Sequence, residues 1–275
     1  MPIFHSEAIV LRSFNLSEAD KLITLMTNRY GKIKCVAKAA RKIKNRFGAS
    51  IEPMSHIRLI YFGKENQTLY RLNHSDIIHS FQEIRGDLQK IYTGVYFIEL
   101  IDTLTPEMHP DLNIFQLLQD GLKALENISS IDTLTRIFEM KLMCLAGYAP
   151  QLNHCTTCKR IDYTKKIGFS FERRGIICEL CSLQVNPEIY FQIGILKYLK
   201  KLKTIDIKHS NRLKFPKGTE LEIEQLLHRY ILSHTGRELK SYPFIRDMKN
   251  VFENTSLVAD YMFIQKLKRT RPGGT

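Results

Sequence analysis

Residues 28–37 have the sequence Asn-Arg-Tyr-Gly-Lys-Ile-Lys-Cys-Val-Ala, and this stretch predicts the fold of the first part of the chain. Gly31 can adopt the positive φ angle that a hairpin turn requires. Beyond the turn, Ile33 and Cys35 alternate with two lysines. A period of two in a β-strand places the apolar side chains on the core face and the lysines on the other face. We therefore predict a turn followed by a half-buried strand.

Short apolar runs on both sides of this turn predict further strands. They cover residues 8–11, 22–26, 57–62 and 68–72, and the last two flank a turn at residues 63–66. Five short strands within about eighty residues suggest a small barrel, and the OB-fold is a five-stranded Greek-key barrel that binds oligonucleotides on one face. We therefore predict an α+β protein in which residues 1–80 form an N-terminal OB-fold β-barrel.

After this region the apolar residues recur at the spacing of a helix. The pattern predicts helices over residues 87–104, 109–125, 132–146, 188–203 and 218–233. Gly147 and Pro150 end the third of these helices. We expect one helical bundle domain, made of residues 81–150 and 185–250, followed by a C-terminal basic tail, residues 251–275.

Four of the six cysteines form two Cys-x-x-Cys pairs. Cys155 and Cys158 are separated by nineteen residues from Cys178 and Cys181, a spacing typical of a zinc site. Four thiolates complete a tetrahedral shell, so we expect one Zn²⁺ with a structural rather than a catalytic role. Neither pair opens a βαβ unit, which argues against redox dithiols. We predict a four-cysteine zinc-finger insertion over residues 151–184.

The positive charge of the chain is concentrated in three segments. The chain has 41 Lys and Arg against 28 Asp and Glu, a formal charge of +13. Residues 21–51 contain no acid and carry +9, residues 197–217 carry +7, and residues 266–271 of the tail carry +4, so the rest of the chain carries −7. The basic residues of the tail are Lys266, Lys268, Arg269 and Arg271. Clustered charge of one sign attracts polyanions, and nucleic acid is the commonest of them.

We expect the first of these segments to bind DNA through basic and aromatic residues. The predicted phosphate contacts are Lys32, Lys34, Lys38, Arg41, Lys42, Lys44 and Arg46. Tyr30 and Phe47 are predicted to stack on bases, because single-strand binders combine a basic groove with aromatic platforms; core packing is the alternative for Phe47. Neutralising about five phosphates would give a slope of log K against log salt of about −3.5 on single strands.

Composition and motifs exclude several classes of protein. The chain is 44% hydrophobic and 25% charged, which is ordinary for a globular protein and excludes a disordered chain. No run of about 20 apolar residues is present, so we expect no membrane insertion. The phosphate-loop, dinucleotide, hydrolase and metalloprotease motifs are absent, so we expect no enzyme. We expect a cytoplasmic, nucleoid-associated protein with reduced thiols.

The order of a basic barrel, a helical body and a four-cysteine insertion resembles the RecO family of bacterial DNA repair and recombination mediators. The stretches that carry the resemblance are residues 8–12, 18–21, 30–33, 36–41, 46–48, 147–152 and 234–241. Two positions depart from the family pattern. The family usually has glycine where this chain has Ala39, and often has glycine where it has Lys159.

The resemblance implies a function that composition and spacing do not give. It implies binding to single- and double-stranded DNA and annealing of complementary strands without ATP. It implies RecR as a partner and recognition of the acidic C-terminal tail of the single-stranded DNA-binding protein. It also implies that the chain and RecR together help RecA to replace that protein on gapped DNA.

Three other readings remain open from the residues alone. The chain could be a zinc-ribbon module that binds RNA or the ribosome, which would prefer RNA over DNA in competition. It could be a zinc-stabilised enzyme, which would need a concave site with perturbed acids or bases. It could also be an adaptor that holds an acidic protein tail through residues 197–217.

Overall fold

The first five strands close into a barrel in the order β1-β2-β3-β5-β4. They are β1 (Ile3–Asn15), β2 (Lys21–Thr27), β3 (Gly31–Ala37), β4 (His56–Phe62) and β5 (Tyr70–His79). β4 pairs back onto β1, and β3 and β5 form the one parallel pair of the barrel. This five-stranded closed order confirms the predicted OB-type barrel. The computed structural model describes residues 2–65, 67–163, 166–216 and 218–247, so the predicted basic tail lies outside the described residues.

The alternation in β3 is as predicted, and β1 is longer than predicted. Ile33 and Cys35 are buried in the barrel core, and burial raises the pKa of the Cys35 thiol. β1 runs for 13 residues because it pairs with β4 along its first half and with β2 along its second half. A register shift between Val10 and Arg12 lies where it passes from one half to the other. Such irregularities bend a strand and allow it to serve both sides of a closed barrel.

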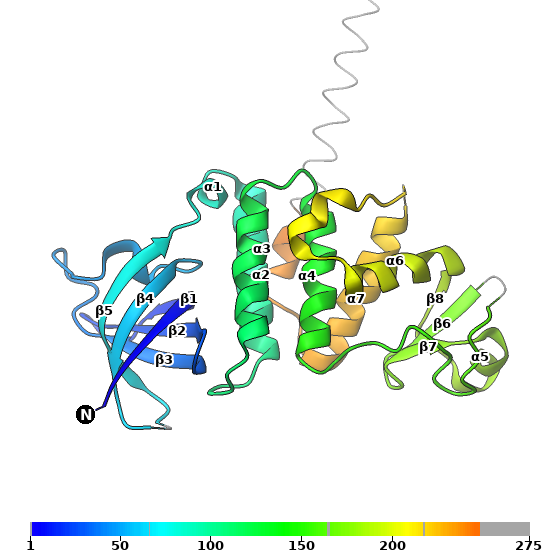
Figure 1. The fold of residues 1–275 in the computed structure, drawn as a ribbon, viewed down its shortest axis with the longest axis horizontal. Coiled ribbons are helices and arrows are strands. Elements are labelled where there is room, and N and C mark those ends of the chain that lie inside the picture. Colours follow the sequence, from blue (N-terminus) through cyan, green and yellow to red (C-terminus); the bar gives the residue numbers. More distant parts are fainter. Residues whose placement is uncertain (1, 66, 164–165, 217, 248–275) are drawn as a thin grey trace, which may run out of the picture.

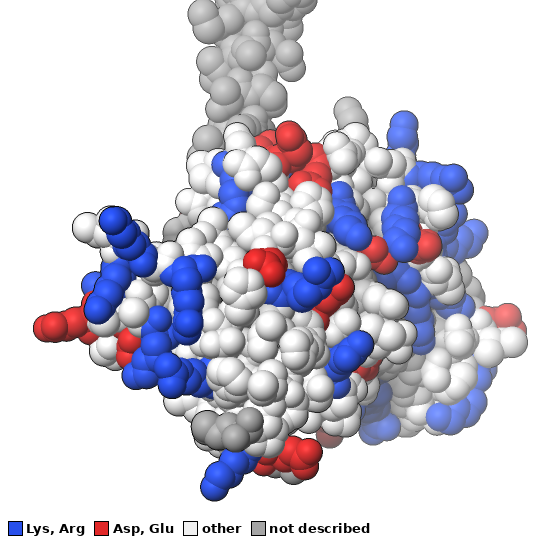
Figure 2. Space-filling view, turned by 60° about the vertical axis from the view of Figure 1, so that its left-hand side comes forward, with Lys and Arg blue, Asp and Glu red and all other residues white. Residues whose placement is uncertain are grey.

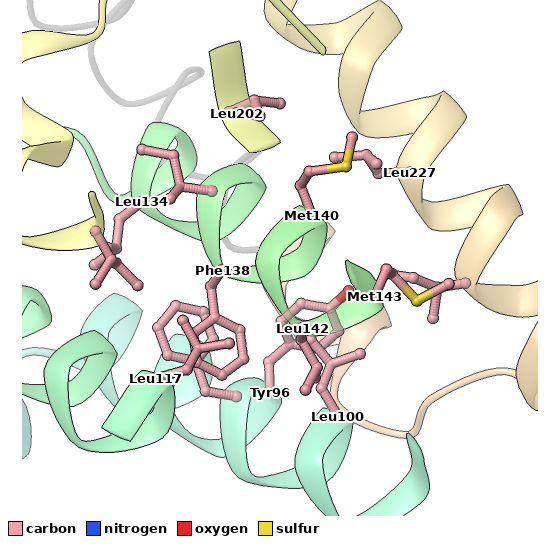
Figure 3. Packing of buried hydrophobic residues seen from close by; sticks show 14 of the residues in the cluster. Tyr96, Leu100, Leu117, Leu134, Phe138, Met140, Leu142, Met143, Leu202 and Leu227 are labelled. Atoms are coloured by element: carbon pink, nitrogen blue, oxygen red, sulfur yellow. The ribbon is translucent and has the colours of Figure 1, made fainter. Parts of the chain in front are cut away.

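The helical part packs around one central helix, α4. Its helices are α1 (Gln82–Arg85), α2 (Leu88–Leu104), α3 (Leu112–Glu126), α4 (Ile131–Leu145), α6 (Ile193–Thr204) and α7 (Thr219–Thr235), with a 3₁₀ turn η2 (Ile207–Arg212). Asp87, Asp111 and Ser130 cap α2, α3 and α4 with side-chain oxygens that accept backbone N–H groups. Figure 3 shows side chains of α4 reaching towards α2, α3, α6 and α7, and the rings of Phe97 and Phe138 stack at 3.9 Å.

The cysteine segment forms a small sheet at the far end of the helices from the barrel (Figure 1). Its elements are β6 (Lys166–Ser170), β7 (Gly175–Ile177), α5 (Glu179–Val185) and β8 (Ile189–Gln192). The predicted helix over residues 188–203 is wrong at its start, because residues 189–192 pair with β6 and helix α6 begins only at Ile193. The pairing partners lie twenty or more residues away in sequence, so the local helical spacing gave no sign of them.

The outer face of β1 and β2 is covered by the helices. Ile9, Leu11 and Met26 point away from the barrel core and belong to the same buried cluster as the side chains of α2 and α3. We call this contact between barrel and helices the joint, and two features of the joint require glycine at position 31. Its φ is +69°, and a Cβ at this position would lie 2.3 Å from the backbone oxygen of His109. The N–H of Met108 also donates to the oxygen of Lys32 at 2.9 Å.

An ion cluster lies in the same joint. Asp102, in the last turn of α2, pairs with Arg12 of β1 and with Lys32 of β3, whose Nζ is 3.3 Å from Asp102 Oδ1. The side chains of Lys32 and Asp102 are only 7% and 11% exposed, so both charges are largely desolvated. Pairing is what makes such burial tolerable.

Among the described helices, none is long and apolar enough to cross a bilayer.

Replacing Asp102 with alanine is expected to lower the free energy of unfolding by about 3–5 kcal/mol, because the Lys32 ammonium would stay buried without a counter-charge. Denaturant unfolding followed by circular dichroism measures this change. Lys32→Met is the matched control: it removes the buried ammonium and leaves Asp102 paired with Arg12, so its loss should be smaller. Equal stability of the two variants would contradict this role for Asp102.

Candidate nucleic-acid interface and metal centre

The basic loop, residues 38–46, leaves the end of β3 and is held against the loop between β1 and β2. The carboxylate of Asp20 accepts the N–H of Ala39 at 2.9 Å and pairs with Lys38 Nζ at 2.7 Å. Hydrogen bonding from Lys38 and then from Ala39 lowers the pKa of Asp20. Arg41 donates from its guanidinium to the oxygen of Ser17 at 2.7 Å. Lys38 and Arg41, predicted as phosphate contacts, therefore also anchor the loop.

The loop conformation needs two further residues that the sequence reasoning did not single out. Ala39 has a φ of +59°, a conformation that glycine adopts more readily than a residue with a Cβ. Asn45 Oδ1 accepts the N–H groups of Phe47 and Gly48 at 3.0 and 2.7 Å, and its Nδ2 donates to the oxygen of Lys42 at 3.2 Å. Asparagine is a common turn-forming residue because its side chain bonds nearby backbone, and that signal could have identified Asn45.

Three predicted cations of the loop are free of ionic partners. Lys42, Lys44 and Arg46 are exposed, and within the described ranges no carboxylate lies at ion-pair distance from them. Arg71 of β5 is also exposed and is the register partner of Val36, next to the end of β3. The sequence reasoning missed Arg71 because this parallel pairing is not local. Figure 2, with the barrel end turned forward, shows Lys and Arg gathered on one side of that end.

The prediction that Lys32 contacts DNA is wrong. The strand pattern placed this side chain correctly on the face opposite the barrel core, but that face is covered by the helices and the ammonium is buried against Asp102. Lys34, on the same face, is 39% exposed and pairs with Glu107 at 2.5 Å. The carboxylates of Asp102 and Glu107 lie in α2 and just after it. A charge count restricted to residues 21–51 could not include them.

The two predicted stacking residues are placed differently from the prediction. Phe47 is 4% exposed in the barrel core, so it does not present a face to bases. The guanidinium of Arg46 instead lies 5.0 Å from the centre of its ring. Tyr30 is half-buried and meets Phe4 and Tyr61 edge to face. Tyr30 lies just before the first residue of β3, whereas the basic loop begins just after its last residue. The seven residues of this strand span about 23 Å, and this length separates Tyr30 from the loop.

The second basic segment, residues 197–217, begins in α6 and continues through the 3₁₀ turn η2. Lys197, Lys201 and Lys203 are exposed on α6, and Leu199 and Leu202 of the same helix are buried. Lys208 pairs with Asp120 at 3.1 Å. These three lysines of α6 therefore face solvent, while Lys200 is half-buried and Lys217 lies outside the described residues.

The four predicted metal ligands come together. The sulfur atoms of Cys155, Cys158, Cys178 and Cys181 all lie within 4.8 Å of one another, and those of Cys158 and Cys178 are 3.6 Å apart. Four sulfurs at about 2.3 Å from one ion in a tetrahedron would be spaced comparably. Lys159, which follows the first pair, also has a positive φ, of +63°.

The electrostatics of the cluster suit a cation. Burial opposes ionisation of the Cys155 thiol, but the N–H groups of Cys158 and Cys178 favour it more, and the pKa of Cys155 falls to about 6. Desolvation and then hydrogen bonding with Cys158 raise the pKa of Cys181 to about 12. Together the sulfurs can all carry charge only when a cation lies between them, and thiolates are the ligands that Zn²⁺ prefers in closed structural sites.

Comparisons with known proteins cover nearly all of the described chain. Residues 1–81 match the family model described as recombination protein O N terminal, and residues 85–243 match recombination protein O C terminal. The chain is 30% identical over 253 residues to a DNA repair protein RecO of Symbiobacterium thermophilum, covering 91% of this chain and 99% of that protein. It is 31% identical to one of Desulfatibacillum aliphaticivorans, covering 90% of this chain and 98% of that protein. The barrel, the helical part and the two family matches together show that the chain belongs to the RecO family of DNA repair proteins.

Proposed function

We propose that this chain is a recombination mediator that binds single- and double-stranded DNA through the basic loop and acts without covalent catalysis. The observation that carries the proposal is the exposed group of Lys42, Lys44 and Arg46, whose charges no described carboxylate neutralises. Lys38, Arg41 and Lys34 are secondary contacts, because each already has a protein partner. Arg71 extends the same basic edge.

Annealing follows from this binding mode without ATP. Two complementary strands repel each other through their phosphates, and cations held between them reduce that repulsion. The loop offers mainly contacts to the phosphates of the DNA, since the aromatic residue next to it, Phe47, is buried and cannot stack on bases. Bases therefore remain free to pair while the phosphates are held.

The family membership supports three partners for this activity. We propose that the chain acts with RecR, binds the acidic tail of the single-stranded DNA-binding protein, and with RecR helps RecA to load on gapped DNA. The exposed lysines of α6 provide the charge that an acidic tail requires. The described cysteines are all unpaired thiols, which suits a reducing cytoplasm and work at the nucleoid.

One structural Zn²⁺ held by Cys155, Cys158, Cys178 and Cys181 is also proposed. It would supply four metal–sulfur bonds to a module whose own buried core is small, comprising mainly Cys155, Ile177 and Cys178. Because all four ligands are protein thiolates, the ion leaves no position for substrate. It would tie β7 and α5 to the loop that precedes β6.

Substituting Lys42 and Lys44 with alanine is expected to weaken single-stranded DNA binding and to reduce the slope of log K against log salt by about 1.4, because two phosphate contacts are lost. Fluorescence anisotropy over a salt series measures both quantities. Lys42→Glu/Lys44→Glu should weaken binding further. Lys64→Ala, an exposed lysine on the β4–β5 turn, is the control. Wild-type affinity of the double glutamate variant would refute the assignment of this loop.

Annealing on protein-coated strands is expected to depend on the acidic tail. Complementary strands coated with single-stranded DNA-binding protein should anneal in the presence of the chain, and a coating protein that lacks its tail should abolish the acceleration. Naked strands, which carry no coating protein, should anneal in the presence of the chain whether or not the tail matters. Fluorescence quenching between end-labelled strands follows the rate, and equal rates on both coats would count against the tail as a partner.

Removal of zinc is expected to destabilise the cysteine module without unfolding the barrel. Metal analysis should find one zinc per chain in the wild type and less in Cys155→Ser, whose melting temperature should fall by at least about 5 °C. Cys144→Ser, which changes a cysteine outside the cluster, should keep the metal. A zinc-free wild-type protein with unchanged melting would contradict the proposed site.

A further inference from the structure

A pocket of about 400 Å³ lies where the cysteine module meets the helices, and we call it the junction pocket. It is lined by Tyr148, Phe171, Glu172, Arg174, Ser233 and His234. The first follows α4, the next three lie on the turn between β6 and β7, and the last two belong to the final turn of α7. Three segments that are distant in sequence therefore build it. Neither the four-cysteine site nor the basic loop contributes a lining residue.

Aromatic rings form much of its wall and are fixed in place. The rings of Tyr148 and His234 meet at 4.7 Å, and His234 in turn meets Tyr230 at 4.5 Å. The hydroxyl of Tyr230, which is fully buried, donates to the oxygen of Tyr148 at 2.9 Å. Tyr148, Phe171 and His234 are all half-buried, so each keeps part of its surface open to a ligand.

Arginines lie over these rings. The guanidinium of Arg174 is 5.9 Å from the centre of the Tyr148 ring, and that of Arg229 is 5.4 Å from the centre of the Phe171 ring. Arg173, Arg174 and Arg229 are exposed, and in the part of the chain that the structure describes no carboxylate forms an ion pair with them. Glu172 is the one acid among the lining residues. Because Glu172 offsets Arg174 among the lining residues, the positive charge beside the aromatic faces comes from Arg173 and Arg229, which flank the pocket.

The backbone holds Arg174 in an uncommon conformation. Its φ is +52°, which is unfavourable for a residue with a Cβ, and its N–H donates to the oxygen of Phe171 at 3.2 Å. Its own oxygen accepts the N–H of Gln151 at 2.8 Å. A turn that is tied down on both sides directs this side chain over Tyr148. Strained residues of this kind concentrate where a side chain must be aimed at a ligand.

Aromatic rings beside arginines are what sequence-tolerant single-strand binding uses, because bases stack on the rings and the guanidiniums bind the flanking phosphates. We propose that the junction pocket is a second DNA-contact site, which takes one unpaired base and its neighbouring phosphates. This proposal rests on the proposed DNA-binding function. The cysteine module, whose β6–β7 turn lines the pocket, lies at one end of the helices, and the barrel that carries the basic loop lies at the other (Figure 1), so one molecule would hold a strand at two separated points.

The test compares oligonucleotides of two lengths. One of about 12 nucleotides, within the range of a single OB-fold, can reach only one site, and one about three times as long can reach both. In Arg174→Glu/Arg229→Glu, affinity for the long strand should fall by about tenfold or more, while affinity for the short strand should change by less than about threefold. Tyr148→Ala should weaken long-strand binding about fivefold, which corresponds to the lower limit for one stacked base.

Conservative variants separate stacking from folding. Tyr148→Phe keeps the ring and should bind like the wild type, while Arg174→Lys/Arg229→Lys keeps the charge and should show an intermediate loss. Zinc content and melting temperature should match the wild type in all of them. Wild-type long-strand affinity in both Arg174→Glu/Arg229→Glu and Tyr148→Ala would overturn the proposal.

The two proposals fail in different ways. If the basic-loop variant Lys42→Glu/Lys44→Glu loses binding and the junction variants do not, the second site is wrong and the proposed function stands. If the wild type itself binds no DNA, the proposed function fails. If the junction variants keep DNA affinity but lose binding to an acidic peptide, the pocket is a protein-binding site, and the present proposal is overturned.

Discussion

The buried carboxylate of Asp102 fixes how the barrel lies against the helices. It joins Arg12 of the first strand and Lys32 of the third strand to the last turn of α2. An ion pair that is largely desolvated is stable only in good geometry, so it orients the two parts more strictly than apolar packing alone would. Ile9, Leu11 and Met26 supply the apolar packing around it.

This joint decides which faces of the molecule remain available. The face of β3 that carries Lys32 and Lys34 is the face that the helices cover. Lys32, Lys34 and Lys38 each meet a carboxylate, whereas Lys42, Lys44 and Arg46, in the loop beyond β3, have no such partner among the described residues. The net charge of the chain is therefore a poor guide to the binding surface, because part of it is used to assemble the fold.

Features with a strong local pattern could be predicted from the sequence, and features that depend on distant pairing could not. The alternation around Ile33, the helical spacing of apolar residues and the two Cys-x-x-Cys pairs predicted the barrel, the helices and the four-cysteine cluster. The burial of Lys32 depends on Asp102, seventy residues away, and the strand at residues 189–192 depends on β6. Phe47 shows the same limit, since its neighbours in the barrel core come from other strands.

The buried core of the cysteine module is small, yet the module positions the β6–β7 turn against the helices. Its β6–β7 hairpin reaches α7, where Phe169 meets Tyr230 edge to face. The metal centre would thereby stabilise a surface outside the module itself, since the same hairpin carries Phe171 and Arg174.

The way in which Asp20 and Asn45 hold the basic loop has a thermodynamic consequence. A disordered loop would lose conformational entropy when it closed on DNA, and that loss would weaken the complex. Here Asp20 fixes Ala39, and Asn45 fixes the backbone around Phe47 and Gly48, before any ligand arrives. Most of the ordering has then taken place during folding. Association would be governed by electrostatic attraction and by the release of counterions, and only weakly by rearrangement of the protein.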